Sequence, residues 1–449
     1  MRLLCSGDGR VVKIVQKNVD PTSSFRLSHF VYAFEKEDAV AMKHTLTKQV
    51  LLLTREEWSA LRTGTLSAKM REELARLRFL VEPDEDETSQ YITVLSVLRI
   101  MEKRKPGIES YTILPTTGCN ARCIYCYEEG WQAKTMSAET ADAVVEFICR
   151  TKRKGKIRLD WFGGEPLCGA GTISRICAGL RNRGVAFYST VITNATILTP
   201  ELVKEAVKCW NLQRAQVSMD GAKADYERRK RYVRPKLHNY ETAMEAVKLL
   251  SEAGVNVMLR CNYDAENLPR VKEFFDDCKA RFSGRDNISY YMEQLFQSSG
   301  VEENAALFRS AAEVAAHLDR LGLASTERMN QRLKIHYCMA DSGDSGVIID
   351  PLGGLHVCEH DIEGKPFGTI FDQTLSWPSV DADTAEECRD CCFLPDCTPF
   401  RKDRCLLKIA ACKMQMAIRT ERSLTALLSS PPDGSESVGD DETPEGECP

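Results

Sequence analysis

Three cysteines stand within eight residues of one another, at Cys119, Cys123 and Cys126. Their spacing is C-x3-C-x2-C, and an aromatic residue, Tyr125, directly precedes the third. Three thiolates on one short loop can ligate a single metal cluster. Because a [4Fe–4S] cluster takes four ligands, one iron would then be open to a ligand from outside the protein. The alternatives are a zinc knuckle or three unrelated thiols. Zinc usually takes four ligands in two paired knuckles, and the sequence has no fourth ligand near these three cysteines. The spacing therefore favours an iron–sulfur cluster.

A second motif, Gly163-Gly164-Glu165-Pro166, follows a predicted strand one βα unit after the cysteines. Two glycines let the backbone approach a ligand closely. The glutamate beside them can accept hydrogen bonds from an ammonium group. Alone, this sequence could be an ordinary turn, but its place after the cysteine motif indicates a second part of the same site.

Together, these two motifs resemble the signature of the radical S-adenosylmethionine (SAM) superfamily. The resemblance implies that SAM chelates the open iron through its amino and carboxylate groups, and that GGEP holds the amino group. It also implies that the reduced cluster passes one electron to SAM, and that the resulting 5′-deoxyadenosyl radical takes a hydrogen from the substrate. The catalytic candidates are Cys119, Cys123 and Cys126, and the first candidates for SAM binding are Gly163, Gly164, Glu165 and Pro166.

Further residues match the SAM pocket of that superfamily more loosely. Thr193-Asn194 resembles the family's TNG turn, although position 195 is alanine. The resemblance places other polar strand-end residues around the SAM ribose and carboxylate and puts Tyr125 near the adenine. The alternative is that each polar side chain only satisfies a neighbouring loop. The additional candidates are Tyr125, Asn194, Ser218, Asp220, Arg260 and Asn262.

The central part of the chain alternates predicted strands with helical segments. Helix-capping signals stand at Ser137, at Thr199-Pro200 and at Asn239, and such β-then-α units favour a parallel sheet with crossover helices. The resemblance implies the same α/β fold class, a partial (β/α)6 barrel of the TIM-like kind over residues 111–300, followed by a connecting helix within 301–335. The predicted strands cover residues 111–115, 157–162, 185–193, 215–220, 255–262 and 288–295.

Residues 1–85 carry no catalytic constellation. Strands are expected at 30–34 and 49–53, followed by a helix capped by Thr54, a second helix and a returning strand. This order resembles the winged-helix peptide-binding module called the RiPP recognition element. If the resemblance holds, a leader peptide would add a strand to the edge of its sheet. The alternative is a structural cap, and residues 86–110 are expected to form a linker with a bridging helix.

Eight cysteines crowd into residues 338–412. Their spacing closely resembles the SPASM domain, expected here over 336–420, and the resemblance implies two auxiliary [4Fe–4S] clusters. Where the family has a further cysteine, position 401 is arginine, so Cys405 is taken as its replacement. The resemblance assigns Cys388, Cys391, Cys397 and Cys412 to a distal cluster, and Cys338, Cys358 and Cys405 to a proximal one.

Three ligands would leave the proximal cluster with an open iron, to which the thiolate of a substrate cysteine could bind. That arrangement suggests thioether formation, in which the bound sulfur bonds to a peptide carbon that has lost a hydrogen. The alternatives are that His356, Cys392 or water fills the site and that the cluster only relays electrons. A zinc ribbon is a further alternative, although zinc favours two tidy cysteine pairs.

The composition is that of an ordinary globular protein. The chain has 449 residues, 43% of them hydrophobic, and a net charge of −5, which gives no general signal for nucleic-acid binding. No apolar run is long enough to span a membrane, and the apolar stretch in residues 1–15 is too short to predict a secretory signal peptide. Nineteen cysteines without an export signal indicate metal or redox chemistry in a reducing cytoplasm. The acidic residues 421–449 are expected to form a disordered tail.

As a whole, the chain resembles a radical SAM/SPASM peptide maturase of the type that forms sactipeptides or ranthipeptides. The expected substrate is a ribosomally made precursor peptide with a leader and a cysteine-containing core. The expected electron donor is a protein such as flavodoxin or ferredoxin. The alternatives are carbon–carbon or carbon–oxygen crosslinking, epimerisation, oxidation of a single residue to formylglycine as in sulfatase maturation, and a non-catalytic iron–sulfur or zinc scaffold. The GGEP motif argues against the scaffold, because a scaffold needs no site for the SAM amino group.

Overall fold

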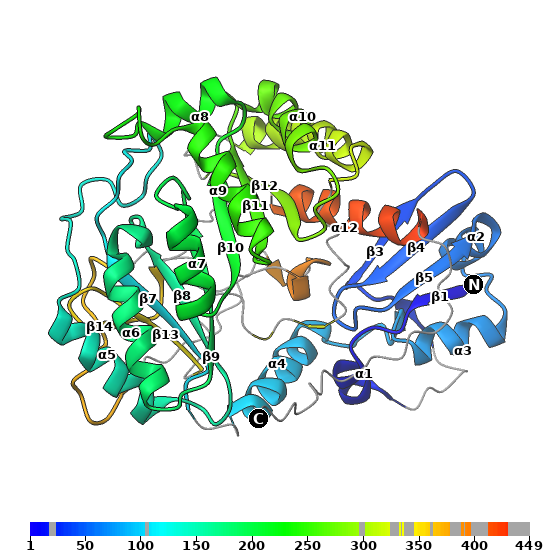
Figure 1. Ribbon diagram of the computed structural model, residues 1–449. Helices are drawn as coiled ribbons and strands as arrows, with labels where there is room; N and C mark the ends of the chain where they lie inside the picture. The colour runs from blue at the N-terminus through cyan, green and yellow to red at the C-terminus, as the bar shows by residue number, and fades with distance from the viewer. Residues whose placement is uncertain are drawn as a thin grey trace, which may run out of the picture.

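A computed structural model describes most of the chain (Figure 1). The described residues are 1–17, 24–103, 107–295, 301–323, 332–333, 335, 345–359, 362–377, 388–389, 391–396 and 412–429. Of the predicted cluster ligands, Cys338, Cys397 and Cys405 lie outside these ranges. Within the described part, no helix is both long and apolar enough to cross a membrane.

Six parallel strands form the centre of the molecule. They are β7 (Ser110–Thr116), β8 (Ile157–Gly163), β9 (Phe187–Thr193), β10 (Leu212–Met219), β11 (Asn256–Tyr263) and β12 (Ile288–Gln294). Each pairs in parallel with the next along the chain. All six lie where the sequence predicted strands, so the α/β class with a parallel sheet is confirmed.

Helices cover one face of this sheet (Figure 1). In β8, Ile157, Leu159 and Trp161 are fully buried against that helical layer, whereas the alternating side chains Arg158 and Asp160 are only partly buried. The helical segments of this region are α5 (Ala138–Thr151), η1 (Pro166–Gly169), α6 (Ala170–Asn182), α7 (Pro200–Cys209), α8 (Lys223–Lys230), α9 (Tyr240–Glu252), η2 (Leu268–Arg270), α10 (Val271–Phe282) and α11 (Val301–Arg320).

The predicted helix starts are confirmed by their capping contacts. Ser137, Thr199 and Asn239 each accept a hydrogen bond from a backbone N–H in the first turn of α5, α7 and α9. Such contacts satisfy N–H groups that have no partner within the helix. The helices therefore begin at fixed residues, and the carboxyl ends of the six strands are left at one edge of the sheet.

The large sheet extends beyond β7 through residues that the sequence assigned to the cysteine-rich region. Strand β13 (Gly346–Ile349) pairs in parallel with β7, and β14 (Gly354–His356) and β15 (Gly368–Thr369) follow in antiparallel order. The sequence did not predict this extension. Its physical reason is burial, because Val347, Ile348 and Ile349 are all fully buried.

The N-terminal residues form a second sheet in the order β1 (Arg2–Cys5), β5 (Val50–Thr54), β4 (Ala39–His44) and β3 (Val31–Glu35). Strands β3 and β5 were expected, whereas β1, β4 and helix α1 (Gly9–Val15) were not. The capping of α2 (Arg55–Thr63) by Thr54 is confirmed, and α3 (Ala68–Arg76) follows it. The returning strand β6 (Leu80–Val81) pairs with β2 (Arg26–Leu27) and not with the main sheet.

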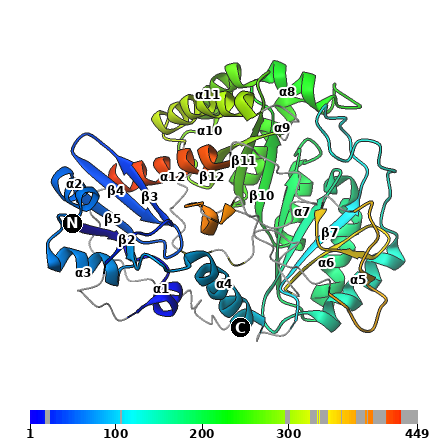
Figure 2. The ribbon, with the colours of Figure 1, turned by 180° about the vertical axis from the view of Figure 1, so that it is seen from behind.

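Two helices join this sheet to the rest of the molecule (Figure 2). Helix α4 (Glu87–Lys103) is the predicted bridging helix. Helix α12 (Cys412–Ser429) packs Leu424 against the N-terminal sheet, and Arg422 lies 3.4 Å from Asp319 of α11. The prediction that a disordered tail begins at residue 421 is therefore wrong, because 421–429 belong to this packed helix.

Candidate active site

The cysteine loop leaves the carboxyl end of β7. Cys119, Cys123 and Cys126 are partly buried, and the first two pack against the core of the parallel sheet. Burial raises the pKa of the Cys119 thiol to about 12 and also raises the pKa values of Cys123 and Cys126. The negative charge of Cys123 would disfavour ionisation of both other thiols, which places the three sulfurs in one electrostatic environment.

Backbone hydrogen bonds hold this loop against the end of α8. Arg122 N donates to Lys230 O at 3.0 Å, and Ile124 N donates to Arg229 O at 3.0 Å. The backbone carbonyls of Arg229 and Lys230 can accept these bonds because α8 ends there, at Arg231, which takes a left-handed conformation with φ 47°. The loop is therefore positioned by α8 as well as by β7.

The Gly163-Gly164 pair lies directly against the chain that enters the cysteine loop. A Cβ atom on Gly164 would stand 2.4 Å from Thr117 O and 2.7 Å from Gly118 O. Gly163 has φ 122°, a backbone conformation that side chains rarely adopt. Glu165 N donates to Gly118 O at 3.0 Å, so the two predicted motifs are joined directly.

This close approach predicts the effect of Gly164→Ala. The added methyl group would overlap backbone carbonyls, which cannot move as a flexible side chain can, so we expect a loss of about 1–3 kcal/mol in stability. We also expect the cysteine loop to shift and reconstituted iron per chain to fall. Gly171→Ala is the matched control, because nothing lies within 4 Å of its Cβ position. Equal iron content and thermal stability in the two variants would contradict this account of the contact.

Glu165 is buried at the centre of the site. It accepts hydrogen bonds from Thr193 Oγ1 at 2.6 Å, from Asn194 N at 2.8 Å and from Leu167 N at 3.1 Å. A carboxylate can accept about four hydrogen bonds, so these three leave room for a cationic donor. Burial raises the pKa of this carboxyl, and a bound ammonium group would favour its charged form.

Asn194 is tied to the cysteine loop. Its Nδ2 donates to Asn120 Oδ1 at 2.8 Å, and Asn120 Nδ2 donates to Thr196 Oγ1 at 3.1 Å. Ala195 occupies the place of the expected glycine and does adopt a left-handed φ of 64°. The turn after β9 therefore has the backbone geometry that the sequence suggested, and in this structure Asn194 positions the loop.

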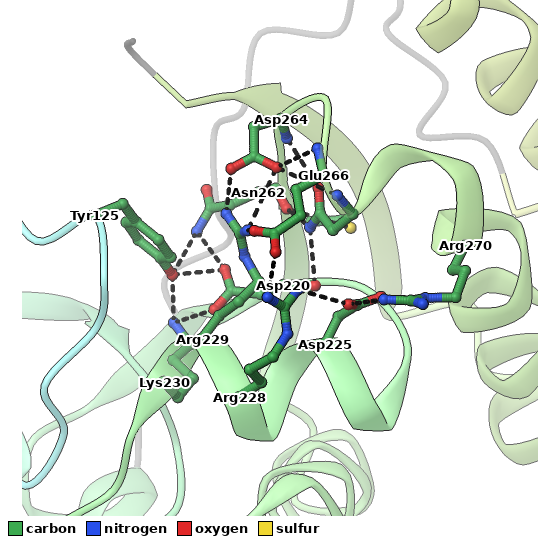
Figure 3. A network of polar contacts seen from close by, with 12 residues as sticks. Tyr125, Asp220, Asp225, Arg228, Arg229, Lys230, Asn262, Asp264, Glu266 and Arg270 are labelled. Carbon is green, nitrogen blue, oxygen red and sulfur yellow. Dashed lines mark hydrogen bonds and ion pairs between the residues drawn. The ribbon is translucent and has the colours of Figure 1, made fainter.

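A second group of candidates converges on the other side of the loop (Figure 3). Tyr125 OH donates to Asp220 Oδ1 at 2.5 Å, and Asn262 Nδ2 lies 3.3 Å from the same oxygen. Arg260 Nε donates to Asn262 Oδ1 at 2.9 Å. Ser218 is the register partner of Arg260 on the neighbouring strand. The structure therefore brings together all the predicted residues of this side.

Two buried cations in this group, Arg229 and Lys230, were not predicted from the sequence. Lys230 Nζ lies 3.1 Å from Tyr125 OH and 3.5 Å from Asp220 Oδ2, and Arg229 Nη2 lies 2.6 Å from Asp264 Oδ2 (Figure 3). Both side chains are almost completely buried. Burial by itself would lower the pKa of Lys230, but the neighbouring Asp220 carboxylate raises this pKa well above its usual range. The basic run at 228–231 resembles a solvated surface, and nothing in its pattern separates the buried cations from the exposed ones.

The loop residues fit an iron–sulfur cluster with SAM. The fit rests on the chemistry of three features. Three thiols that form no disulfide stand on one loop, Gly163 and Gly164 lie directly against that loop, and the buried Glu165 carboxylate can accept a further hydrogen bond. On the opposite side, Asp220 Oδ2 is buried and has no hydrogen-bond partner among the described residues. Within the same described ranges, no three His, Cys, Asp or Glu side chains are arranged to hold a single metal ion.

The predicted auxiliary ligands are described only in part. Cys391 is buried in the apolar cluster that contains Phe30 of the N-terminal region and Tyr91 of α4, and Cys388 packs against that cluster. Cys358 is partly buried, and Cys412 begins α12. His356, the alternative donor, already has Nε2 at 3.0 Å from Asp350 Oδ2. The auxiliary clusters therefore stay a prediction.

Residues 113–278 match the family model of the Radical SAM superfamily. The matched range begins in β7, ends in α10 and contains both the cysteine loop and Gly163–Pro166. The chain therefore carries a radical SAM domain, and the match implies a [4Fe–4S] cluster and SAM as its cofactors. The resemblance to the radical SAM superfamily that the cysteine and GGEP motifs suggested is therefore confirmed.

Several curated relatives share parts of the chain. An uncharacterized protein of Methanocaldococcus jannaschii is 23% identical over 283 residues, 61% of this chain and 93% of that protein. The AdoMet-dependent heme synthase of Methanosarcina barkeri is 29% identical over 168 residues, covering 36% of this chain and 45% of the enzyme. The radical SAM cyclopropyl synthase TigE of Paramaledivibacter caminithermalis is 23% identical over 187 residues, 38% of this chain and 37% of that enzyme. The match spans less than half the length of each of these two enzymes.

Solved structures share the fold. The structure of anSMEcpe with bound AdoMet has a TM-score of 0.56 and 16% identity, and it covers 72% of this chain and 98% of its own. The same protein with bound AdoMet and Cp18Cys peptide has a TM-score of 0.55 and 15% identity, covering 71% of this chain and 99% of its own. At these identities, the similarity shows the fold alone.

Proposed function

We propose that this radical SAM enzyme modifies a ribosomally made precursor peptide and forms intramolecular thioether crosslinks from cysteine sulfur to carbon. The single observation that carries the radical SAM part is the position of the cysteine loop. It lies between the Gly163–Glu165 cradle on one side and Asp220 with Asn262 on the other. When bound, the cluster and SAM supply a hydrogen-abstracting radical.

The residues of the chain have separate tasks in this proposal. Cys119, Cys123 and Cys126 would ligate three irons and leave the fourth for SAM. Glu165 would accept a hydrogen bond from the SAM amino group, next to the glycine backbone. Arg260 is a cation on the inner side of the sheet, suited to the SAM carboxylate. The buried contacts around Glu165 and Asp220 fix these groups before SAM binds, which lowers the cost of ordering them.

The choice of a peptide as substrate rests on three supports. The cysteine spacing over 338–412 resembles the SPASM domain. The anSMEcpe protein, whose fold is similar, was solved with a Cp18Cys peptide. The third support is the separate N-terminal sheet, whose edge strands β1 and β3 could pair with an extended leader. Thioether formation in particular rests on the proposed three-ligand auxiliary cluster, which would hold a peptide thiolate.

The experiment that tests this function uses anaerobically reconstituted enzyme, SAM, dithionite and a cysteine-containing precursor peptide encoded next to the enzyme. We expect 5′-deoxyadenosine and a peptide that has lost two hydrogens per crosslink and no longer reacts with a thiol-alkylating reagent at one cysteine. Loss of hydrogen with all thiols still reactive would instead indicate carbon–carbon or carbon–oxygen crosslinking. An unchanged mass with a new D-residue would indicate epimerisation, and an aldehyde in place of a cysteine or serine would indicate formylglycine formation.

A direct prediction concerns SAM binding by Glu165. Glu165→Gln keeps the size of the side chain but removes the charge that would face the ammonium group. A hydrogen bond to a charged group contributes about 1.5–3 kcal/mol, so we expect SAM affinity to fall roughly 10- to 100-fold. Equilibrium dialysis with the reconstituted protein measures it. Glu201→Gln is the control, since Glu201 is exposed in the first turn of α7 and its hydrogen bonds are with Thr199 and its own backbone. Equal SAM affinity in both variants would remove Glu165 from the SAM site.

A further inference from the structure

The segment 228–238, which covers the last turn of α8 and most of the loop that leads to α9, is strongly basic. It holds six arginines and lysines and no acidic residue, in a chain whose net charge is −5. Arg229 and Lys230 are buried and paired, and Arg228 pairs with Asp225 and Glu266. The remaining three cations, Arg231, Arg234 and Lys236, are exposed, and the described part of the chain gives none of them an ion-pair partner.

This basic segment adjoins the outer side of the cysteine loop. Val233 N donates to Asn120 O at 2.9 Å, and Arg122 N lies 3.1 Å from Arg231 O. Arg122 adds a fourth exposed cation, whose guanidinium donates to Cys119 O at 2.8 Å. The positive charge therefore gathers where the candidate cluster-binding loop reaches the surface of the protein.

Exposed apolar side chains lie among these cations. Val233 is 60% exposed, Leu237 is 58% exposed, and Ile124 of the cysteine loop is 39% exposed. Apolar residues with a charged rim are the usual composition of a protein–protein contact. We name the surface formed by Arg122, Ile124, Arg231, Val233, Arg234, Lys236 and Leu237 the basic loop surface.

We propose that the basic loop surface docks an acidic electron-transfer protein that reduces the cluster held by the cysteine loop. The inference rests on the proposed radical SAM chemistry, which consumes one electron for each SAM cleaved. In the docked complex the partner would be oxidised by one electron and the cluster reduced by one. Charge complementarity selects an acidic partner and accelerates its approach, and the apolar residues bury their exposed area in the contact.

The test compares two reductants on full-length reconstituted enzyme. The variant Arg234→Glu/Lys236→Glu reverses two exposed charges that make no side-chain contact with the cysteine loop among the described residues. The control, Lys13→Glu/Lys69→Glu, makes the same charge change on exposed residues of α1 and α3 in the N-terminal region. With flavodoxin as probe at low ionic strength, we expect its affinity for the first variant, measured by isothermal titration calorimetry, to fall about 10-fold or more, and flavodoxin-dependent SAM cleavage to fall with it. We expect the control to match the unmodified chain and the difference to shrink at high salt.

Dithionite, a small reductant that needs no docking surface, separates the two possible failures. All three proteins should cleave SAM equally well with dithionite. If none of them does, the proposed function fails, whatever the surface binds. If cleavage with dithionite is normal and flavodoxin reduces both variants equally, the docking proposal is overturned. It is also overturned if the basic loop variant loses peptide modification with dithionite, since the surface would then bind an acidic segment of the substrate.

Discussion

Replacing Cys119, Cys123 and Cys126 together with alanine is expected to remove about four irons per chain, one whole cluster by stoichiometry. Reductive cleavage of SAM should fall below detection. The three thiols share one loop and none of them forms a disulfide in the structure, so the variant removes every thiol that this loop carries. Iron and acid-labile sulfide after anaerobic reconstitution, together with 5′-deoxyadenosine, provide the measurement.

The remaining iron in this triple variant tests the auxiliary clusters. If two such clusters are present, unmodified protein should hold roughly twelve irons and the variant about eight, at four irons per cluster. Cys149→Ala/Cys209→Ala is the control, because both residues are partly buried thiols on helices α5 and α7. The assignment of the loop fails if the control loses as much iron as the triple variant, or if the triple variant still cleaves SAM.

The second large effect is expected from Lys230→Met, which removes the buried cation beside Asp220 and Tyr125. Asp220 would keep a buried charge with one oxygen already lacking a hydrogen-bond partner among the described residues. Breaking a buried ion pair by removing one partner typically costs about 3–5 kcal/mol. We expect a loss of that size in the free energy of unfolding. Fluorescence of Trp161 and Trp210, both fully buried in the parallel-sheet region, reports the transition in urea.

Two further variants separate charge from packing at this position. Arg228→Met removes a cation two residues earlier that is 47% exposed, and we expect it to cost less than about 1 kcal/mol. Lys230→Met/Asp220→Asn removes both charges and should recover part of the stability lost in the single variant. A Lys230→Met protein that unfolds at the same urea concentration as the unmodified chain would show that the pair contributes nothing to stability.

The fold of the central region could be predicted because its signals are local. Strand β8 alternates buried and partly buried side chains, and Ser137, Thr199 and Asn239 mark the helix starts. Strand β13 gave no such signal, because its pairing with β7 joins residues far apart in the chain. Helix α12 was not predicted. The acidic composition of the end of the chain suggested a disordered tail from residue 421, although Leu424 packs against the N-terminal sheet.

In the site, residues on the loops and strand ends could be predicted from their type and order, as Glu165 and Asn262 show. Lys230 could not, because a basic run gives no information on which of its members the fold turns inward. The left-handed turn at Arg231 brings the end of α8 against the cysteine loop, and Lys230 is buried as a result. Asn120 was missed for a similar reason, since its partners Asn194 and Thr196 come from a distant turn.

The most direct test of the central claim is the fate of SAM with anaerobically reconstituted protein and dithionite. We predict that the unmodified chain converts SAM to 5′-deoxyadenosine and methionine, that the Cys119/Cys123/Cys126→Ala variant does not, and that deuterium from a labelled precursor peptide enters the 5′-deoxyadenosine. Protein that reconstitutes with zinc and little iron and leaves SAM intact would contradict the account and favour a metal-binding scaffold.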